Sequence, residues 1–203
     1  MLTAYFQGLG AGAGLIIAIG AQNAFVLSHG IRRSHLLTIT LICSLCDAIL
    51  IMAGVCGVGS IVASNPALTR IAALGGAIFL FAYGLKAFHS AFCGDVLKAE
   101  KDGKSSWARV VVATLAVTLL NPHVYLDTIV LLGSISGRFA DDGRFIFGVG
   151  AATASFLWFF LLSYGGRLLA PAFGRPMTWR VLDMSVGLVM WSIAASLAVS
   201  LFG

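Results

Sequence analysis

Long apolar runs, separated by short polar or turn-forming stretches, occupy almost the whole chain. An α-helix needs about 20 apolar residues to cross a bilayer, and each run is long enough to do so. The six runs lie at about Thr3–Leu27, Leu36–Val62, Ala67–Phe92, Val110–Ser134, Phe145–Ala170 and Val181–Phe202. The pattern therefore predicts an all-α integral membrane protein with six transmembrane helices.

The composition agrees with a chain that lies almost entirely in a membrane. Of its 203 residues, 59% are hydrophobic and 10% are charged, whereas about 25% are charged in an ordinary soluble domain. Six spans leave no room for a large extramembrane enzyme, and no phosphate-binding loop motif is present to support ATP hydrolysis. The 13 Lys and Arg residues are scattered between the apolar runs, so we do not expect nucleic-acid binding.

The basic residues also predict an orientation, because cytoplasmic loops of membrane proteins carry the excess of Lys and Arg. The first, third and fifth connections hold nine of them, and the second and fourth hold three. We therefore expect the odd-numbered connections in the cytoplasm and both termini in the periplasm. The assignment is firmer for the C-terminus, because the uncharged N-terminus could re-enter the membrane without changing this count.

Two halves of three spans each, residues 1–92 and 110–203, are expected to form a single transporter domain, joined by a cytoplasmic loop at 93–109. Because three is an odd number of crossings, any structural similarity between the halves must be of inverted topology, as in many transporters. The internal sequence similarity is limited to the first span of each half, where Gln22–Leu27 can be laid over Asn121–Leu126: each is a polar pair followed by an apolar, partly aromatic run.

Two carboxylates lie inside predicted spans, where an Asp costs roughly 2.5–3.5 kcal/mol on insertion scales and is a functional candidate by default. Asp47 is near the middle of the second span. Asp127 follows His123 by four residues in the fourth span, so a continuous helix would place both on one face. The alternatives are a protonated Asp47 that ties helices together and an Asp127–His123 pair that only lines a hydrated crevice.

Asn121-Pro122 interrupts the fourth span. Pro cannot continue a helix from the preceding turn, and Asn followed by Pro is typical of a helix start. A half-helix would then begin inside the membrane with its N–H groups available to a carboxylate; the alternative is a simple kink. Gln22 and Asn23 could bind a small polar solute or cross-link helices, and Asp183 is expected to pair with Arg180.

These groups suit a basic amino acid, whose carboxylate would meet the helix N-terminus and amides while its cationic side chain pairs with an Asp. Outward movement of a cation costs about 2.3 kcal/mol per 100 mV, so we expect coupling to an entering proton. No cofactor is expected. The four cysteines, Cys43, Cys46, Cys56 and Cys93, predict neither a disulfide framework nor a metal site.

At these residues the sequence resembles the lysine/arginine exporter family of bacterial inner-membrane proteins, the LysE type. The resemblance covers nearly the whole chain and is most specific at Ile19–Val26 (IGAQNAFV) and Leu120–Asp127 (LNPHVYLD). It implies export of L-arginine or L-lysine driven by the proton motive force, by a protein that is not an enzyme. Ala21 stands where similar proteins usually have Pro, so a break in the first span would depend on Gly20.

The predicted site follows from these residues. The candidate substrate-binding residues are Gln22, Asn23, Asp47, Asn121, Tyr125 and Asp127; the candidate proton-coupling residues are Asp47, His123 and Asp127; and the predicted helix breaks are at Gly20 and Pro122. The expected partners are L-arginine, L-lysine, protons and membrane lipid, with a homo-oligomer left open. The competing hypotheses are an exporter of another small solute, such as a neutral amino acid or a metal cation, and an intramembrane enzyme or sensor.

Overall fold

A computed structural model describes residues 1–17, 20–57, 66–93, 106–139, 142–173 and 176–202. Over these residues the structure contains helices and no strand, so the predicted all-α fold is confirmed there. The helices are α1 (Leu2–Ile16), α2 (Ala21–Ile31), α3 (Leu36–Val55), α5 (Pro66–Cys93), α7 (Trp107–Leu119), α8 (Pro122–Tyr125), the π-helix η1 (Leu126–Leu131), α9 (Leu132–Ser136), α10 (Gly143–Leu169), the 3-10 helix η2 (Ala170–Phe173) and α11 (Pro176–Phe202).

Three helical segments are long and apolar enough to cross a membrane: Leu36–Val55, Gly143–Phe173 and Met177–Val199. Two bent pairs of helices meet the same criterion when each pair is taken as one span, which gives up to five. α1 and α2 are bent by 83° relative to each other, and α7 is bent by 62° relative to the helical segment His123–Ser136. The sixth predicted span, which falls within α5, stays a prediction.

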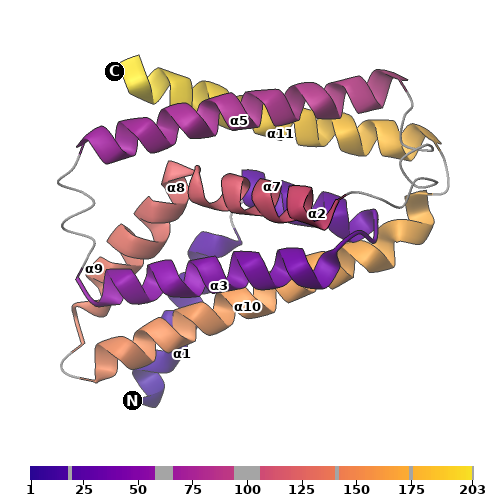
Figure 1. The fold of residues 1–203 in the computed structure, drawn as a ribbon. Helices are drawn as coiled ribbons and strands as arrows, with labels where there is room; N and C mark the ends of the chain where they lie inside the picture. The colour runs from indigo at the N-terminus through magenta and orange to yellow at the C-terminus, as the bar shows by residue number, and fades with distance from the viewer. Residues whose placement is uncertain (18–19, 58–65, 94–105, 140–141, 174–175, 203) are drawn as a thin grey trace.

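The helices are arranged around the two bent pairs (Figure 1). α5 and α11 run side by side along one edge of the molecule, and α3 lies against α10. In this view the N-terminus lies at the lower left and the C-terminus at the upper left. The predicted loop 93–109 falls mostly outside the described residues, as does the predicted end of the second span at Val62.

Close helix packing brings the bent segments against their neighbours. A Cβ atom added to Gly12 of α1 would lie 2.9 Å from the carbonyl oxygen of Ala151 in α10, and one added to Gly54 of α3 would lie 2.6 Å from the carbonyl oxygen of Ile129 in η1. Small residues permit such backbone contacts between helices in membranes. These contacts fix α1 against α10 and η1 against α3.

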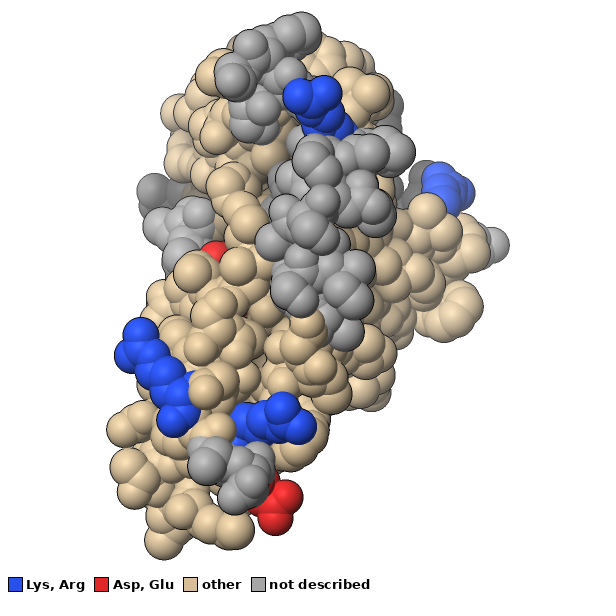
Figure 2. All heavy atoms as spheres, turned by 90° about the vertical axis from the view of Figure 1, so that its left-hand side faces the viewer, with Lys and Arg blue, Asp and Glu red and all other residues tan. Residues whose placement is uncertain are grey.

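The outer surface of the helices is largely apolar, as lipid contact requires. Leu45 and Ile49 of α3, Leu157 and Leu161 of α10, and Leu188 of α11 are all at least half exposed. Figure 2 shows the face of the molecule that lies on the left in Figure 1, where a few basic side chains stand among mostly uncharged residues. Cys43, Cys46 and Cys56 are free thiols.

Candidate functional site

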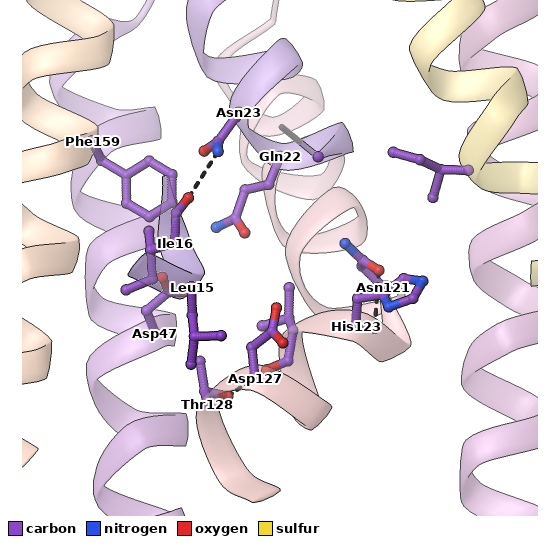
Figure 3. A pocket seen from close by; sticks show the side chains of 13 residues that line it. Leu15, Ile16, Gln22, Asn23, Asp47, Asn121, His123, Asp127, Thr128 and Phe159 are labelled. Atoms are coloured by element: carbon purple, nitrogen blue, oxygen red, sulfur yellow. Dashed lines mark hydrogen bonds between the residues drawn. The ribbon is translucent and has the colours of Figure 1, made fainter. Parts of the chain in front are cut away.

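A cavity of about 290 Å³ lies where the two bent helix pairs meet (Figure 3). Small-molecule sites usually span about 300–1,000 Å³, so the cavity suits a solute of roughly amino-acid size. Its lining comes from both halves of the chain: Leu15, Ile16, Gly20, Gln22, Asn23, Asp47, Asn121, His123, Val124, Asp127, Thr128, Phe159 and Ile193. No Lys or Arg is among these lining residues. Among its described lining residues the cavity therefore has two carboxylates and no Lys or Arg to neutralise them.

The break in the second bent pair follows from Asn121-Pro122. α7 ends at Leu119 and α8 begins at Pro122. The buried Asn121 side chain accepts a hydrogen bond from the His123 backbone N–H (3.2 Å), which is the usual role of an Asn before a helix. The side chain that sequence reasoning assigned to substrate binding thus also caps the new helix, beside the cavity.

Asp127 lies in η1, the π-helical turn that continues from α8. Single π turns inside helices often occur at functional sites. Figure 3 shows the Asp127 carboxyl group directed toward the cavity. The His123 ring lies beside Asn121 and points away from Asp127. Both residues line the cavity, although they do not form the directly facing pair that a regular helix would give, because the segment between them is not a regular α-helix.

The break in the first bent pair has a different construction. Gly20 precedes α2 with φ −135° and ψ 175°, an extended conformation that does not require glycine. The Asn23 amide nitrogen donates to the carbonyl oxygen of Ile16 at the end of α1 (2.9 Å), and Trp158 Nε1 of α10 donates to Asn23 Oδ1 (3.2 Å). Asn23 therefore bridges the break and ties it to α10.

Asp47 projects from α3 and is 2% exposed. Its Oδ2 atom accepts a hydrogen bond from Ser155 Oγ of α10 (2.9 Å). Its Oδ1 atom, like the amide nitrogen Nε2 of Gln22, is buried without a hydrogen-bond partner among the described residues. An unpaired buried carboxylate oxygen is costly, and both atoms belong to side chains that line the cavity. The two side chains lie within reach of each other, and beside the cavity Asp47 can accept from a bound solute while Gln22 can donate to it.

Two predicted residues have other neighbours than expected. Tyr125 does not line the cavity; its hydroxyl donates to the carbonyl oxygen of Leu119 at the end of α7 (2.6 Å). Asp183 pairs with Arg32, which follows the last residue of α2, instead of Arg180, and Ser90 Oγ also donates to it (2.8 Å). The expected Arg180 pair was wrong because Asp183 is buried against α2 and α5 while Arg180 is exposed.

Sequence reasoning missed the two α10 residues that position the site, Ser155 and Trp158. Both hydrogen bonds cross between helices more than 100 positions apart in the chain. A serine and a tryptophan in an apolar run carry no periodic or spacing signal. Both residues lie within the part of the chain that the resemblance covers, but the resemblance alone assigns neither of them a role.

Comparison with known proteins identifies the family. The LysE type translocator family matches residues 13–201. The arginine exporter protein ArgO of Pectobacterium atrosepticum is 43% identical over 200 residues, covering 98% of both chains. Those of Klebsiella pneumoniae strain 342 and Shigella flexneri are 44% and 42% identical, each match covering 98% of this chain and 94% of the relative. No solved structure matches the chain. The cavity of this chain holds two carboxylates between broken helices. On the family match and the similarity to these relatives, the chain belongs to the LysE type translocator family.

Proposed function

We propose that this chain is a secondary active exporter of the basic L-amino acids arginine and lysine in the bacterial inner membrane, coupled to proton entry. The observation that carries the proposal is the cavity of about 290 Å³ that holds Asp47 and Asp127 with no Lys or Arg in its lining. A cationic solute is the natural partner of two such carboxylates. Relatives that match over nearly the whole chain are named arginine exporters.

The cavity supports a specific arrangement of the substrate. The guanidinium or ammonium group would lie between the carboxyl groups of Asp47 and Asp127, where a guanidinium can make paired hydrogen bonds. The substrate carboxylate would accept from the free Gln22 amide nitrogen and face the start of the helical run at Asn121. Asn23, whose amide already bonds to Ile16 and Trp158, would hold the first break in place.

The helix contacts support two inverted repeats, residues 1–92 and 110–203, with six spans. α1 of the first half packs on α10 of the second, and α7 of the second half packs on α3 of the first. In the same way, α2 of the first half packs on α10, and η1 and α9 of the second half pack on α3. Each contact thus has a counterpart in which the two halves exchange roles. α5 and α11, the third helices of the halves, pack on each other. Such repeats permit alternating access around a central site.

The membrane potential sets the direction of coupling. It is negative inside and opposes outward movement of cationic arginine by about 2.3 kcal/mol per 100 mV. Exchange of one cationic substrate for one proton is electrically neutral, so the pH gradient alone would drive it. Asp47 and Asp127 are the carboxylates that would bind the proton, with His123 at the cavity as a third candidate.

A metal cation is the less favoured solute on a specific observation. Among the described residues, no three His, Cys, Asp or Glu side chains come together as a metal-ion site. A neutral amino acid would leave the two carboxylates without a cationic partner. Both solutes remain outcomes of the test.

The test is uptake of radiolabelled substrates into everted membrane vesicles in which respiration makes the interior acid and positive. We expect arginine and lysine to accumulate, a protonophore to abolish accumulation, and alanine to be excluded. Vesicles without the protein provide the control. Accumulation of alanine but not of arginine or lysine would refute basic amino-acid specificity, and protonophore-resistant arginine accumulation would refute proton coupling.

A further inference from the structure

A row of buried polar groups extends from the cavity along α3. Thr40, Ser44 and Asp47 are at most 2% exposed. Their spacing of four and three residues places them on one face of the helix. Thr40 and Ser44 are absent from the cavity lining, so this row continues from Asp47 into the protein, toward the N-terminal end of α3 at Leu36.

The hydroxyl groups of Thr40 and Ser44 differ from other hydroxyls on the described helices. A Ser or Thr inside a helix commonly donates to the carbonyl oxygen four residues earlier. Five do so here: Thr114, Thr128, Ser134, Thr153 and Ser185. Thr40 Oγ1 and Ser44 Oγ are instead buried without a hydrogen-bond partner among the described residues. Each is thus available both to donate and to accept.

The spacing of these groups excludes a single ion as their shared ligand. Thr40 and Asp47 are seven residues apart, which is about 10 Å along an α-helix, whereas oxygen ligands must converge to about 2.4 Å from a hard cation. Consecutive groups one turn apart can be bridged by a water molecule that hydrogen-bonds to both. A row of this kind conducts protons, because each hydroxyl or water can accept one proton and release another.

We propose that Thr40 and Ser44, with intervening water, form the path by which a proton leaves Asp47 toward the α2–α3 turn. This inference rests on the proposed function and adds the route of the coupling ion. In the proposed orientation the turn is cytoplasmic, so a proton that enters from the periplasm and binds Asp47 would be released there. The net change is one proton moved from the Asp47 carboxyl group to the cytoplasm, with every hydroxyl restored.

The other ionisable groups around Asp47 leave this route clear. Asp127 and His123 line the cavity with it, and Cys43 and Cys46 share its helix. The remaining ones on the helices packed against α3 lie toward the ends of those helices: His29 of α2 and Arg32 just after it, Arg109 of α7, and Arg144, Tyr164 and Arg167 of α10. His35 precedes α3 at the turn where the proposed path ends. Cys43 has the same spacing on α3, but its thiol lies against Thr118 Oγ1 of α7 (3.8 Å). The side chains in line with Asp47 that lack a partner among the described residues are therefore the two hydroxyls.

The experiment compares two activities of the purified protein in proteoliposomes. Exchange of arginine for arginine at equal pH on both sides requires no net proton movement, whereas accumulation driven by a pH gradient does. The test variant is Thr40→Val with Ser44→Ala. Its matched control is Thr114→Val with Ser136→Ala, which removes two buried hydroxyls that bond to their own helices.

We expect the test variant to lose at least about tenfold in gradient-driven accumulation while its exchange stays near the wild-type rate, and the control to keep both. Thr40→Ser, which retains a hydroxyl, should keep coupled transport. An unchanged test variant, or an equal loss of exchange and accumulation, would overturn the path alone. Wild-type protein that neither exchanges nor accumulates arginine would overturn the proposed function and the path with it.

Discussion

Replacement of Asp47 by Asn tests the central electrostatic argument with little change in shape. Asn keeps an oxygen that can accept the Ser155 hydrogen bond, which is 2.9 Å long in the wild type. It removes the negative charge from a side chain that is 2% exposed and that lines the cavity. It also removes a group that can bind and release a proton.

The expected loss of substrate affinity follows from the hydrogen bond between the substrate and the charged Asp47 carboxylate that the substitution weakens. A hydrogen bond to a charged partner contributes about 1.5–3 kcal/mol, which corresponds to a loss of about 10- to 150-fold in substrate affinity at 1.4 kcal/mol per tenfold. Proton-driven accumulation should disappear altogether if Asp47 carries the proton. Arginine exchange should survive at raised substrate concentration, because Asp127 remains in the cavity.

Radiolabelled exchange and accumulation, measured over a range of arginine concentrations in proteoliposomes, separate these two effects. Asp142→Asn is the matched control, because Asp142 is exposed and makes no side-chain cap at the start of α10; it should behave as wild type. Equal amounts of each variant must be verified in the membrane. Wild-type affinity and accumulation by Asp47→Asn would refute the assignment of Asp47 to both substrate and proton.

Three further substitutions test other parts of the structure. Asn121→Ala removes a helix cap worth about 0.5–2 kcal/mol, and should lower the arginine exchange rate in proteoliposomes; unchanged exchange would contradict the cap's role. Tyr125→Phe, which deletes the hydrogen bond to Leu119, should lower the maximal exchange rate without raising KM, whereas a raised KM would indicate substrate contact. Gly54→Val should lower the thermal unfolding temperature in detergent, because its Cβ would lie 2.6 Å from a backbone oxygen; Gly10→Ala, with nothing within 4 Å, should not.

Much of the helical architecture could be predicted because its causes are local. Apolar runs of spanning length are dictated by the bilayer, and α3 begins at Leu36 as predicted. Pro122 marks a helix start by its own chemistry. The buried carboxylates stood out because charge is rare and costly in an apolar segment, and the structure places both at one cavity.

What the sequence did not predict depends on contacts between distant segments. The π turn that holds Asp127 and the Ser155 bond to Asp47 arise from packing against other helices. The pairing of Asp183 with Arg32 arises in the same way, whereas helix spacing alone favoured Arg180. Residue spacing along one helix predicts partners on that helix only, and it gives no information about partners that other helices bring closer.

The two helix breaks show how the proposed repeats reach a similar solution with different residues. A break inside a membrane frees backbone carbonyl groups that lipid cannot hydrogen-bond. In the first bent pair the Asn23 amide donates to Ile16 at the end of α1; in the second, the Tyr125 hydroxyl donates to Leu119 at the end of α7. Because one of these side chains is an amide and the other a phenol, the two breaks have little sequence similarity. In both breaks, however, the side chain reaches back from the second helix to the end of the first. Trp158 of α10 also donates to Asn23, so a side-chain hydrogen bond ties the first break to a helix of the other half as well as to the end of α1.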